Sequence, residues 1–99
     1  MEINNSFSVI IQARVNSTRL KGKILKKIKK WTYFEILIKR LKKAKNINQI
    51  VVACTKSRED NKIIQLCKKH NIDFFKGSEN DVLKRFFDTA FKYKFKNII

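Results

Sequence analysis

The sequence predicts an α/β fold, built as the first half of a doubly wound and mainly parallel sheet. Three short apolar runs, 9–11, 50–54 and 72–75, are near-continuous, as strands covered on both faces are. Amphipathic helical patterns separate these runs, and a helical crossover between neighbouring strands makes the strands parallel. A last apolar run, 96–99, has the character of a strand opening, which gives the order β-α-β-α-β-α-β.

The first predicted helix begins at Thr32, because Thr32 and Glu35 stand at the spacing of a capping box. Apolar residues then recur at helical spacing, and we expect this stripe to cover one face of the sheet. The stripe consists of Phe34, Leu37, Ile38, Leu41 and Ala44. Residues 24–28, which precede this helix, are too short a run to assign beyond a turn or a brief strand.

The second predicted helix follows Ser57, which with Asp60 three residues later can cap it. It carries Cys67 on its inner side and ends near His70, after which Asn71 can take the left-handed conformation that ends helices. An imidazole at that end can meet the last carbonyl groups of the helix, so we expect a structural role for His70.

The third predicted helix begins after Ser78 or Asn80, either of which can cap it. Asp81 and Arg85 stand four residues apart and are expected to pair along one side of this helix. The expected inner face consists of Val82, Leu83, Phe86 and Ala90.

Length and composition limit the classes to which the protein can belong. A chain of 99 residues is marginal for a sheet that needs helices on both faces, because a chain of this size buries only a little over ~60% of its unfolded surface. Residues 1–99 are therefore one small domain or part of a larger one, and the marginal size favours the second. Cys54 and Cys67 lack zinc-binding spacing and are expected to be buried, reduced thiols.

The formal charge of +16 would usually suggest a polyanionic partner. Its distribution argues otherwise, because the lysines far outnumber the arginines, occur along the whole chain and are not interleaved with aromatic residues. A small basic nucleic-acid-binding protein is therefore kept as the alternative function. No run approaches the roughly 18 apolar residues of a membrane span, and the start lacks the features of a signal peptide, so we expect a cytoplasmic protein without a membrane partner.

Cations and hydroxyl groups crowd the loop that follows the first strand. These residues are Arg14, Ser17, Thr18, Arg19, Lys21 and Lys23. Ligands of open α/β sheets bind outside the carboxyl ends of the strands, so this loop is well placed to hold an anion, although a solvated basic loop would look the same. The loop contains neither the G-x-x-x-x-G-K-[ST] nor the G-x-G-x-x-G motif, which excludes a Walker A or dinucleotide-binding loop.

Three segments at the first strand and its loop fit one long motif. They are Gln12-Ala13-Arg14, Ser17-Thr18-Arg19-Leu20 and Gly22-Lys23-x-Leu25. Together they resemble the signature Q-A-R-x-x-S-T-R-L-P-G-K-x-L of the cytidylyltransferases that activate sugar acids, the CMP-synthetases of sialic acid and keto-deoxyoctulosonate. The match is closest to the spore-coat polysaccharide biosynthesis protein F branch, and Lys21 stands where that family has proline.

A second stretch resembles the same branch. It reads Gly77-Ser78-Glu79-x-Asp81-Val82-Leu83-x-Arg85-Phe86 and is similar to the family's G-S-E-x-D-V-L-x-R-[YF]. The resemblance implies a Rossmann-like nucleotidyltransferase sheet with strand order 3-2-1-4, of which residues 1–99 would be the nucleotide-binding part. The implied partners are CTP or a related nucleotide, a sugar or sugar-acid acceptor, and either a second copy or a second chain that completes the domain.

In the reaction that the resemblance implies, an acceptor oxygen attacks the α-phosphorus of CTP, pyrophosphate leaves, and the activated sugar serves polysaccharide biosynthesis. Arg14 and Lys23 are the expected catalytic residues, because a guanidinium and an ammonium group neutralise charge on phosphoryl oxygens. The implied nucleotide-binding residues are Gln12, Ala13, Arg14, Ser17, Thr18, Arg19, Gly22, Lys23, Gly77 and Ser78.

The resemblance also implies magnesium as a cofactor. In the family a carboxylate just after the fourth strand helps to hold the metal, and that position would follow Ile99, so no metal ligand is expected in this chain. Glu79 and Asp81 are the acids closest to the predicted site, and neither is expected to replace it. We therefore expect the isolated chain to lack nucleotidyltransferase turnover.

Overall fold

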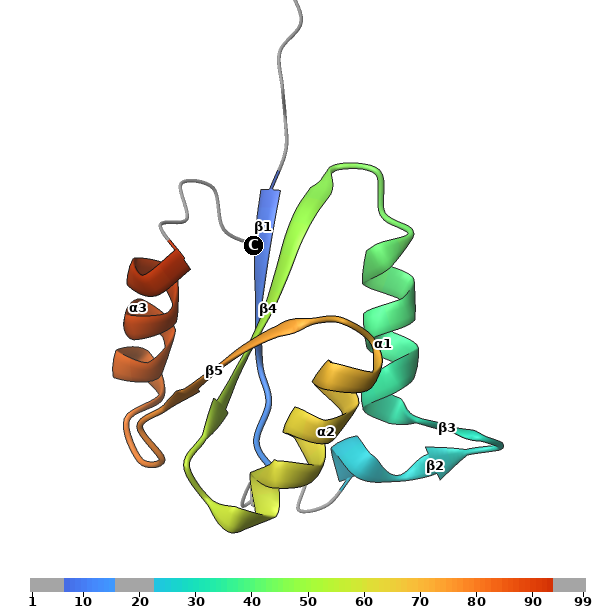
Figure 1. The fold of residues 1–99 in the computed structure, drawn as a ribbon, viewed down its shortest axis with the longest axis horizontal. Coiled ribbons are helices and arrows are strands. Elements are labelled where there is room, and N and C mark those ends of the chain that lie inside the picture. The colour runs from blue at the N-terminus through green and yellow to red at the C-terminus, as the bar shows by residue number, and fades with distance from the viewer. Residues whose placement is uncertain (1–6, 16–22, 94–99) are drawn as a thin grey trace, which may run out of the picture.

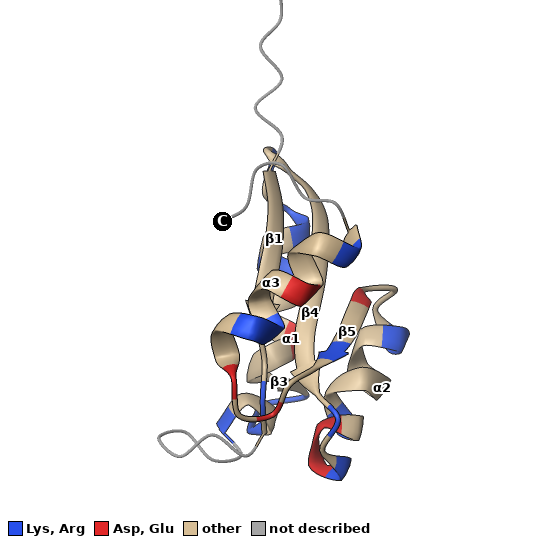
Figure 2. Ribbon diagram, turned by 90° about the vertical axis from the view of Figure 1, so that its left-hand side faces the viewer, with Lys and Arg blue, Asp and Glu red and all other residues tan. Residues whose placement is uncertain are grey.

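Helices cover both faces of a parallel three-stranded sheet in the computed structural model, which describes residues 7–15 and 23–93 (Figure 1). The strands lie in the order β1-β4-β5, and both neighbouring pairs are parallel. The strands are β1 (Phe7–Gln12), β4 (Ile47–Thr55) and β5 (Asp73–Gly77), and the helices are α1 (Tyr33–Lys42), α2 (Asn61–Lys69) and α3 (Val82–Tyr93). α1 and α2 lie on one side of the sheet and α3 on the other (Figures 1 and 2).

The predicted α/β fold is confirmed over the described residues. Each predicted strand overlaps an observed one, and the order β1-β4-β5 matches the 3-2-1 part of the expected order. β4 is the central strand, and residues 51–54 have no exposed surface because strands flank both their edges and helices cover both their faces. The predicted fourth strand, 96–99, lies outside the described residues.

The segment between β1 and α1 forms a 3-10 turn and a β-hairpin. The turn is η1 (Lys23–Leu25), and β2 (Lys27–Ile28) pairs antiparallel with β3 (Trp31–Thr32). Lys29, in the two-residue turn of the hairpin, has a φ of 59°, a left-handed value that is uncommon for a residue with a side chain. The hairpin extends away from the sheet beside α1 (Figure 1).

The predicted capping box of α1 is confirmed. The Glu35 backbone N–H donates to Thr32 Oγ1 at 3.1 Å, and the Thr32 backbone N–H donates to Glu35 Oε1 at 3.2 Å. The predicted apolar stripe is only partly correct, because Phe34 and Ile38 are buried whereas Leu37 is exposed. The helix is rotated so that Glu35 enters the core, where partners on α2 hold its carboxylate.

The Glu35 carboxylate is buried between α1 and the end of α2. His70 Nε2 lies 2.7 Å from Glu35 Oε2, and Lys69 Nζ donates to the same oxygen at 3.3 Å. Burial alone would raise the pKa of Glu35, but the hydrogen bonds from His70, Thr32 and Lys69 outweigh it and lower this pKa to about 2. His70 therefore has the structural role that its position predicted.

The second predicted helix ends as expected but does not begin as expected. Asn71 has a φ of 56°, which ends α2 in the left-handed conformation. Ser57 caps the preceding 3-10 turn, η2 (Arg58–Asp60), because its Oγ accepts from the Glu59 backbone N–H at 3.4 Å. Asp60 makes no capping hydrogen bond to α2, since its carboxylate binds elsewhere.

Both cysteines are buried and unpaired, as predicted. Burial raises the pKa of Cys54 to about 11 and that of Cys67 to about 12, so both thiols stay protonated at neutral pH. No helix of the described part of the chain has both the length and the apolar character that a membrane crossing requires.

The inner face predicted for α3 is only partly correct, because Phe86 and Ala90 are half-buried but the other two predicted residues are exposed. Val82 is 53% exposed and Leu83 is 65% exposed, whereas Arg85 and Thr89 are buried at 3% and 0%. The expected Asp81–Arg85 pair is not formed either, because the Arg85 guanidinium bonds to groups at the ends of β1 and β5. These contacts set the rotation of α3 and override its apolar pattern.

The expected caps of α3 are also wrong. The Asp81 carboxylate accepts from the Lys84 backbone N–H at 2.9 Å, which makes Asp81 the capping residue in place of Ser78 or Asn80. Ser78 Oγ accepts instead from the Asp81 backbone N–H at 3.1 Å and so supports the turn that precedes the helix.

We predict that Glu35 makes the fold sensitive to acid. Because its pKa is lower in the folded than in the unfolded chain, its contribution is complete above about pH 4.5 and is lost as the pH falls toward 2. Denaturant unfolding should show wild type more stable than Glu35→Gln at pH 7, by on the order of 3 kcal/mol at most.

This stability difference should shrink steadily between pH 5 and pH 2. Both proteins carry the same excess of lysines, so general charge repulsion at low pH acts on both and cancels in the comparison. A difference that stays constant over this range would show that the Glu35 carboxylate does not titrate as described.

Candidate nucleotide-binding site

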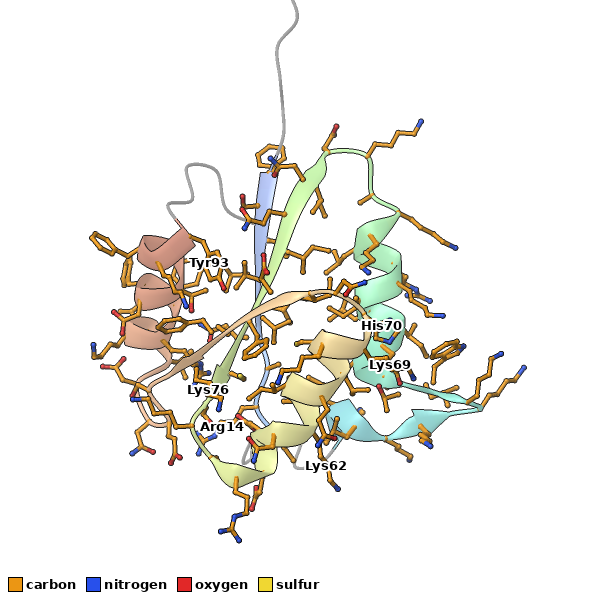
Figure 3. The ribbon with its side chains drawn as sticks, in the orientation of Figure 1. Arg14, Lys62, Lys69, His70, Lys76 and Tyr93 are labelled. Atoms are coloured by element: carbon orange, nitrogen blue, oxygen red, sulfur yellow. The ribbon has the colours of Figure 1, made fainter. Side chains whose placement is uncertain are left out.

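The carboxyl ends of the three parallel strands meet at one edge of the sheet, the lower end of the molecule in Figure 1. Gln12 ends β1, Thr55 ends β4 and Gly77 ends β5, so the segments that follow these strands are brought together. Arg14 and Lys76 lie toward this end in Figure 3. This is the edge at which open α/β sheets bind their ligands.

A buried carboxylate fixes the point at which the chain leaves β1. Asp60 Oδ1 accepts from the Val15 backbone N–H at 2.9 Å, while Asp60 Oδ2 accepts from the backbone N–H and hydroxyl of Thr55, at 2.9 and 2.6 Å. Asp60 and Thr55 are fully buried. The start of the basic loop is therefore tied to the end of β4.

Arg85 joins the ends of β1 and β5. Its Nε donates to Gln12 Oε1 at 2.8 Å and its Nη1 donates to the Ser78 carbonyl at 2.8 Å. In the same cluster Gln12 Nε2 donates to the Val82 carbonyl at 3.2 Å, and Arg14 Nη1 donates to the Glu79 carbonyl at 2.8 Å. The described part of the first stretch singled out in the sequence is thus hydrogen-bonded to the second stretch.

Gly77 is required by the packing of Arg85. A Cβ atom at position 77 would lie 2.6 Å from Arg85 Cγ, which is closer than Cβ atoms approach other atoms in folded proteins, and 3.3 Å from Arg85 Cα, which is a tight contact. The lack of a side chain at Gly77 therefore allows α3 to approach β5, and this approach brings the guanidinium to Gln12.

The site is positively charged and has few acceptors of its own. Arg85 is 3% exposed, and within residues 7–15 and 23–93 no carboxylate forms an ion pair with Arg85 or Arg14. Burial, and next the nearby Arg14 charge, lower the pKa of Arg85. Arg14 Nε is buried and has no hydrogen-bond partner in the same ranges. Because buried charges are costly when unpaired, this arrangement favours an anion.

The structure brings together five of the residues predicted to bind nucleotide: Gln12, Ala13, Arg14, Gly77 and Ser78. Ala13 is fully buried, and its backbone N–H donates to the Ala53 carbonyl at 3.0 Å. Lys23 is exposed in η1. The remaining predicted residues, Ser17, Thr18, Arg19 and Gly22, lie outside the described residues.

Sequence reasoning missed Arg85 as a member of the site and interpreted it as one half of a helical ion pair. The available signal was the second motif, in which an arginine follows the glycine by eight positions. Asp60 was likewise interpreted as a cap, and no motif in the sequence distinguishes that role from its contacts with Val15 and Thr55.

The described residues contain no cluster of three acidic, histidine or cysteine side chains that could hold a metal ion. Of the acids near the site, Asp60 is fully buried among protein donors. Asp81 caps α3 through Oδ1, and both Asp81 and Glu79 are exposed.

A cavity of about 310 Å³ lies at the opposite, amino end of the sheet, between the end of α1, the start of β4 and the start of β5. It contains none of the predicted site residues and has no cluster of charged groups aimed at one point. We therefore assign the candidate site to the carboxyl edge, where the cations converge.

An open parallel sheet with cations at its carboxyl edge is the arrangement found in nucleotide-binding α/β proteins. Comparison with known proteins narrows the class. A family model described as "Cytidylyltransferase" matches residues 8–99. This protein therefore belongs to the cytidylyltransferase family.

Two solved structures resemble the fold. A cytidylyltransferase from Leptospira borgpetersenii serovar Hardjo-bovis (strain JB197) is 35% identical, with a TM-score of 0.87 over 94% of this chain and 39% of that chain. The structure of CMP:2-keto-3-deoxy-manno-octonic acid synthetase complexed with CTP is 20% identical, with a TM-score of 0.66 over 88% and 36% of the two chains. No curated protein matches this chain.

We predict that Gly77 and Arg85 are energetically coupled. Gly77→Ala should lower the free energy of unfolding by about 1 to 3 kcal/mol, because the new methyl group overlaps the Arg85 side chain. In an Arg85→Ala background the same substitution should cost less, since Cγ, the closest atom, is then absent.

A double-mutant cycle by chemical denaturation measures this coupling. A second cycle, in which Lys62→Ala replaces Arg85→Ala, is the matched control, because Lys62 is exposed and makes no contact with Gly77. Equal costs of Gly77→Ala in the wild-type and Arg85→Ala backgrounds would contradict the packing described for Gly77.

Proposed function

We propose that this chain forms the nucleotide-binding part of a cytidylyltransferase that transfers CMP to a sugar or sugar acid for polysaccharide biosynthesis. The two motifs resemble the spore-coat polysaccharide biosynthesis protein F branch, which supports an acceptor of that kind. The chain spans about 39% of the Leptospira cytidylyltransferase, so acceptor recognition and turnover are proposed for the complete enzyme.

The pairing of Arg14 with Arg85 at the carboxyl edge is the observation that carries this proposal. The two guanidinium groups donate to neighbouring carbonyls, Arg14 to Glu79 and Arg85 to Ser78, both at 2.8 Å, and neither has an ion-paired carboxylate in the described ranges. A triphosphate supplies both the charge and the oxygen acceptors that such a site lacks. The similar synthetase structure named above holds CTP, which agrees with a nucleotide as the ligand.

In the proposed reaction an acceptor oxygen forms a bond to the α-phosphorus of CTP, and the bond between the α-phosphorus and the bridging oxygen breaks. Pyrophosphate leaves with that bonding electron pair. Arg14 and Lys23 act by neutralising the charge on the phosphoryl oxygens and on the leaving pyrophosphate. Gln12, held by Arg85, and the turn at Gly77 and Ser78 would border the nucleotide.

Four residues outside the described ranges complete the proposed nucleotide loop: Ser17, Thr18, Arg19 and Gly22. Their hydroxyl, guanidinium and backbone groups suit phosphate oxygens. Magnesium, which the family commonly uses, would add a positive charge at the phosphates. Its protein ligands are not among the described residues, so the proposal assigns no residue here to the metal.

We predict that Arg14→Ala and Lys23→Ala each weaken CTP binding. Each variant removes a charge-assisted contact worth about 1.5 to 3 kcal/mol, which corresponds to roughly a 10- to 150-fold increase in Kd. Titration calorimetry with CTP measures the affinity directly. Lys45→Ala removes the same charge from an exposed position between α1 and β4 and should leave the Kd nearly unchanged.

Equal CTP affinities of wild type, Arg14→Ala and Lys23→Ala would contradict the proposed site. If instead wild type did not bind CTP but bound oligonucleotides with an affinity that fell steeply with salt, this chain would be better described as a small basic nucleic-acid-binding protein. The same titrations can therefore distinguish the two functions.

A further inference from the structure

The hairpin formed by β2 and β3 carries a concentrated basic surface. We call residues 26–31 the basic hairpin; its sequence is Lys26-Lys27-Ile28-Lys29-Lys30-Trp31. All four lysines are exposed, and Ile28 between them is 48% exposed. Four cations and an exposed apolar side chain thus occupy a two-stranded projection whose turn is only two residues long.

Lysines of the hairpin, of α1 and of α2 surround the ring of Trp31. Lys39 Nζ lies 3.2 Å from the ring centroid, and Lys30 Nζ and Lys69 Nζ both lie 5.4 Å from it. These distances are those of cation–π contacts. They hold lysines of α1 and α2 against the base of the hairpin, so the positive charge of three elements forms one surface.

This surface is not balanced by acids. Its one neighbouring carboxylate, Glu35, is buried and ion-paired with Lys69 and His70. Within residues 7–15 and 23–93, no lysine of the basic hairpin forms an ion pair, and neither does Lys39. The acidic residues drawn in Figure 2 lie mainly around α3, at the start of β5 and before α2. The lysines of the hairpin therefore repel one another and favour an anionic partner.

The chemistry of the surface distinguishes between anionic partners. Lysines are compact point charges that suit a diffuse layer of anions, whereas phosphate recognition at defined positions uses the planar arginine guanidinium. Lys39 covers one face of Trp31, which leaves that face closed to a stacked nucleic-acid base. An exposed Ile28 beside a tryptophan fits the boundary between lipid headgroups and acyl chains.

We propose that the basic hairpin binds the anionic surface of a phospholipid bilayer. Electrostatic attraction supplies most of the affinity, and Ile28 enters the headgroup layer. This contact is peripheral and needs no membrane span; it revises the expectation, drawn from the lack of a long apolar run, that the protein has no membrane partner. The hairpin directly follows Lys23 of the proposed nucleotide site, since the Lys26 backbone N–H donates to the Lys23 carbonyl at 3.0 Å, but none of the four hairpin lysines is among the residues assigned to that site.

Cosedimentation with lipid vesicles tests the proposal on the full chain. Wild type should bind vesicles of phosphatidylcholine with 30% phosphatidylglycerol (roughly the anionic share that polybasic segments respond to) and should not bind phosphatidylcholine alone. Binding should weaken as salt is added, because screening shortens electrostatic attraction. Trp31 is the only tryptophan in the chain, so its fluorescence reports directly on the hairpin.

The triple variant Lys27→Gln, Lys29→Gln, Lys30→Gln should lose about 100-fold in vesicle affinity, because each lysine near an anionic surface contributes about a fivefold factor. The matched control is Lys43→Gln, Lys45→Gln, Lys92→Gln, which removes the same charge from exposed positions after α1 and on α3, the helix on the other side of the sheet (Figure 1). This control should bind nearly as well as wild type. Ile28→Ser should reduce binding severalfold without changing the salt dependence.

Several results would overturn the proposal. An equal loss in the hairpin and control variants would show that affinity follows net charge and not the hairpin. Binding of wild type to oligonucleotides but not to anionic vesicles, lost in the hairpin variant, would assign the surface to nucleic acid. Matching unfolding midpoints in wild type and both triple variants are required, and since the hairpin lysines are exposed and unpaired we expect them to match.

Discussion

The guanidinium of Arg85 is the group on which the carboxyl edge of this sheet depends. It bonds to Gln12 at the end of β1 and to Ser78 after β5, and it is buried where α3 crosses the sheet. Three consequences follow from this one position: α3 turns its polar Arg85 and Thr89 inward, residue 77 has room only for glycine, and two distant loops meet. The fold and the candidate site are therefore held by the same contacts.

The electrostatics of the molecule are uneven. Among the described residues two carboxylates are buried, Glu35 and Asp60. Glu35 accepts hydrogen bonds between α1 and the end of α2. Asp60 accepts them from the start of the loop after β1 and from the end of β4. Within the described residues, no carboxylate forms an ion pair with the cations of the carboxyl edge or of the basic hairpin. Net charge alone would not separate these two surfaces, since lysine is abundant throughout the chain. Their neighbours do separate them: strand ends at one, and an exposed Ile28 beside Trp31 at the other.

The parts of the fold that could be predicted from sequence are those decided by local chemistry. Near-continuous apolar runs identified β1, β4 and β5, and the Thr32–Glu35 spacing identified the start of α1. Helix rotation was predicted poorly, because α3 has two candidate apolar faces and tertiary contacts decided between them. The exposed face includes Leu83, Phe87 and Phe91, spaced four residues apart, and it is more apolar than the face that packs.

The candidate site was predictable only in part, for the same physical reason. Motif resemblance identified Arg14 and Gly77, because such motifs record which residue types a site needs. The second motif carried a signal for Arg85, but the contacts of Arg85 and Asp60 could not be predicted, since each bonds to residues far away in the sequence. A charged residue on a helix has a plausible local interpretation, as a cap or an ion pair, and only the folded chain shows which groups it meets.

The long range of the contact between Arg85 and Gln12 has a consequence for how the protein folds. The two residues are separated by 73 positions, so their hydrogen bond closes a loop that includes nearly the whole described chain. Loop closure of this length is entropically costly, and contacts of high sequence separation form late and slow the folding of a chain. The carboxyl edge would then be assembled last, after the β1-β4 pairing is in place. An anion that binds there would act on an edge already formed, and by mass action it would stabilise that edge.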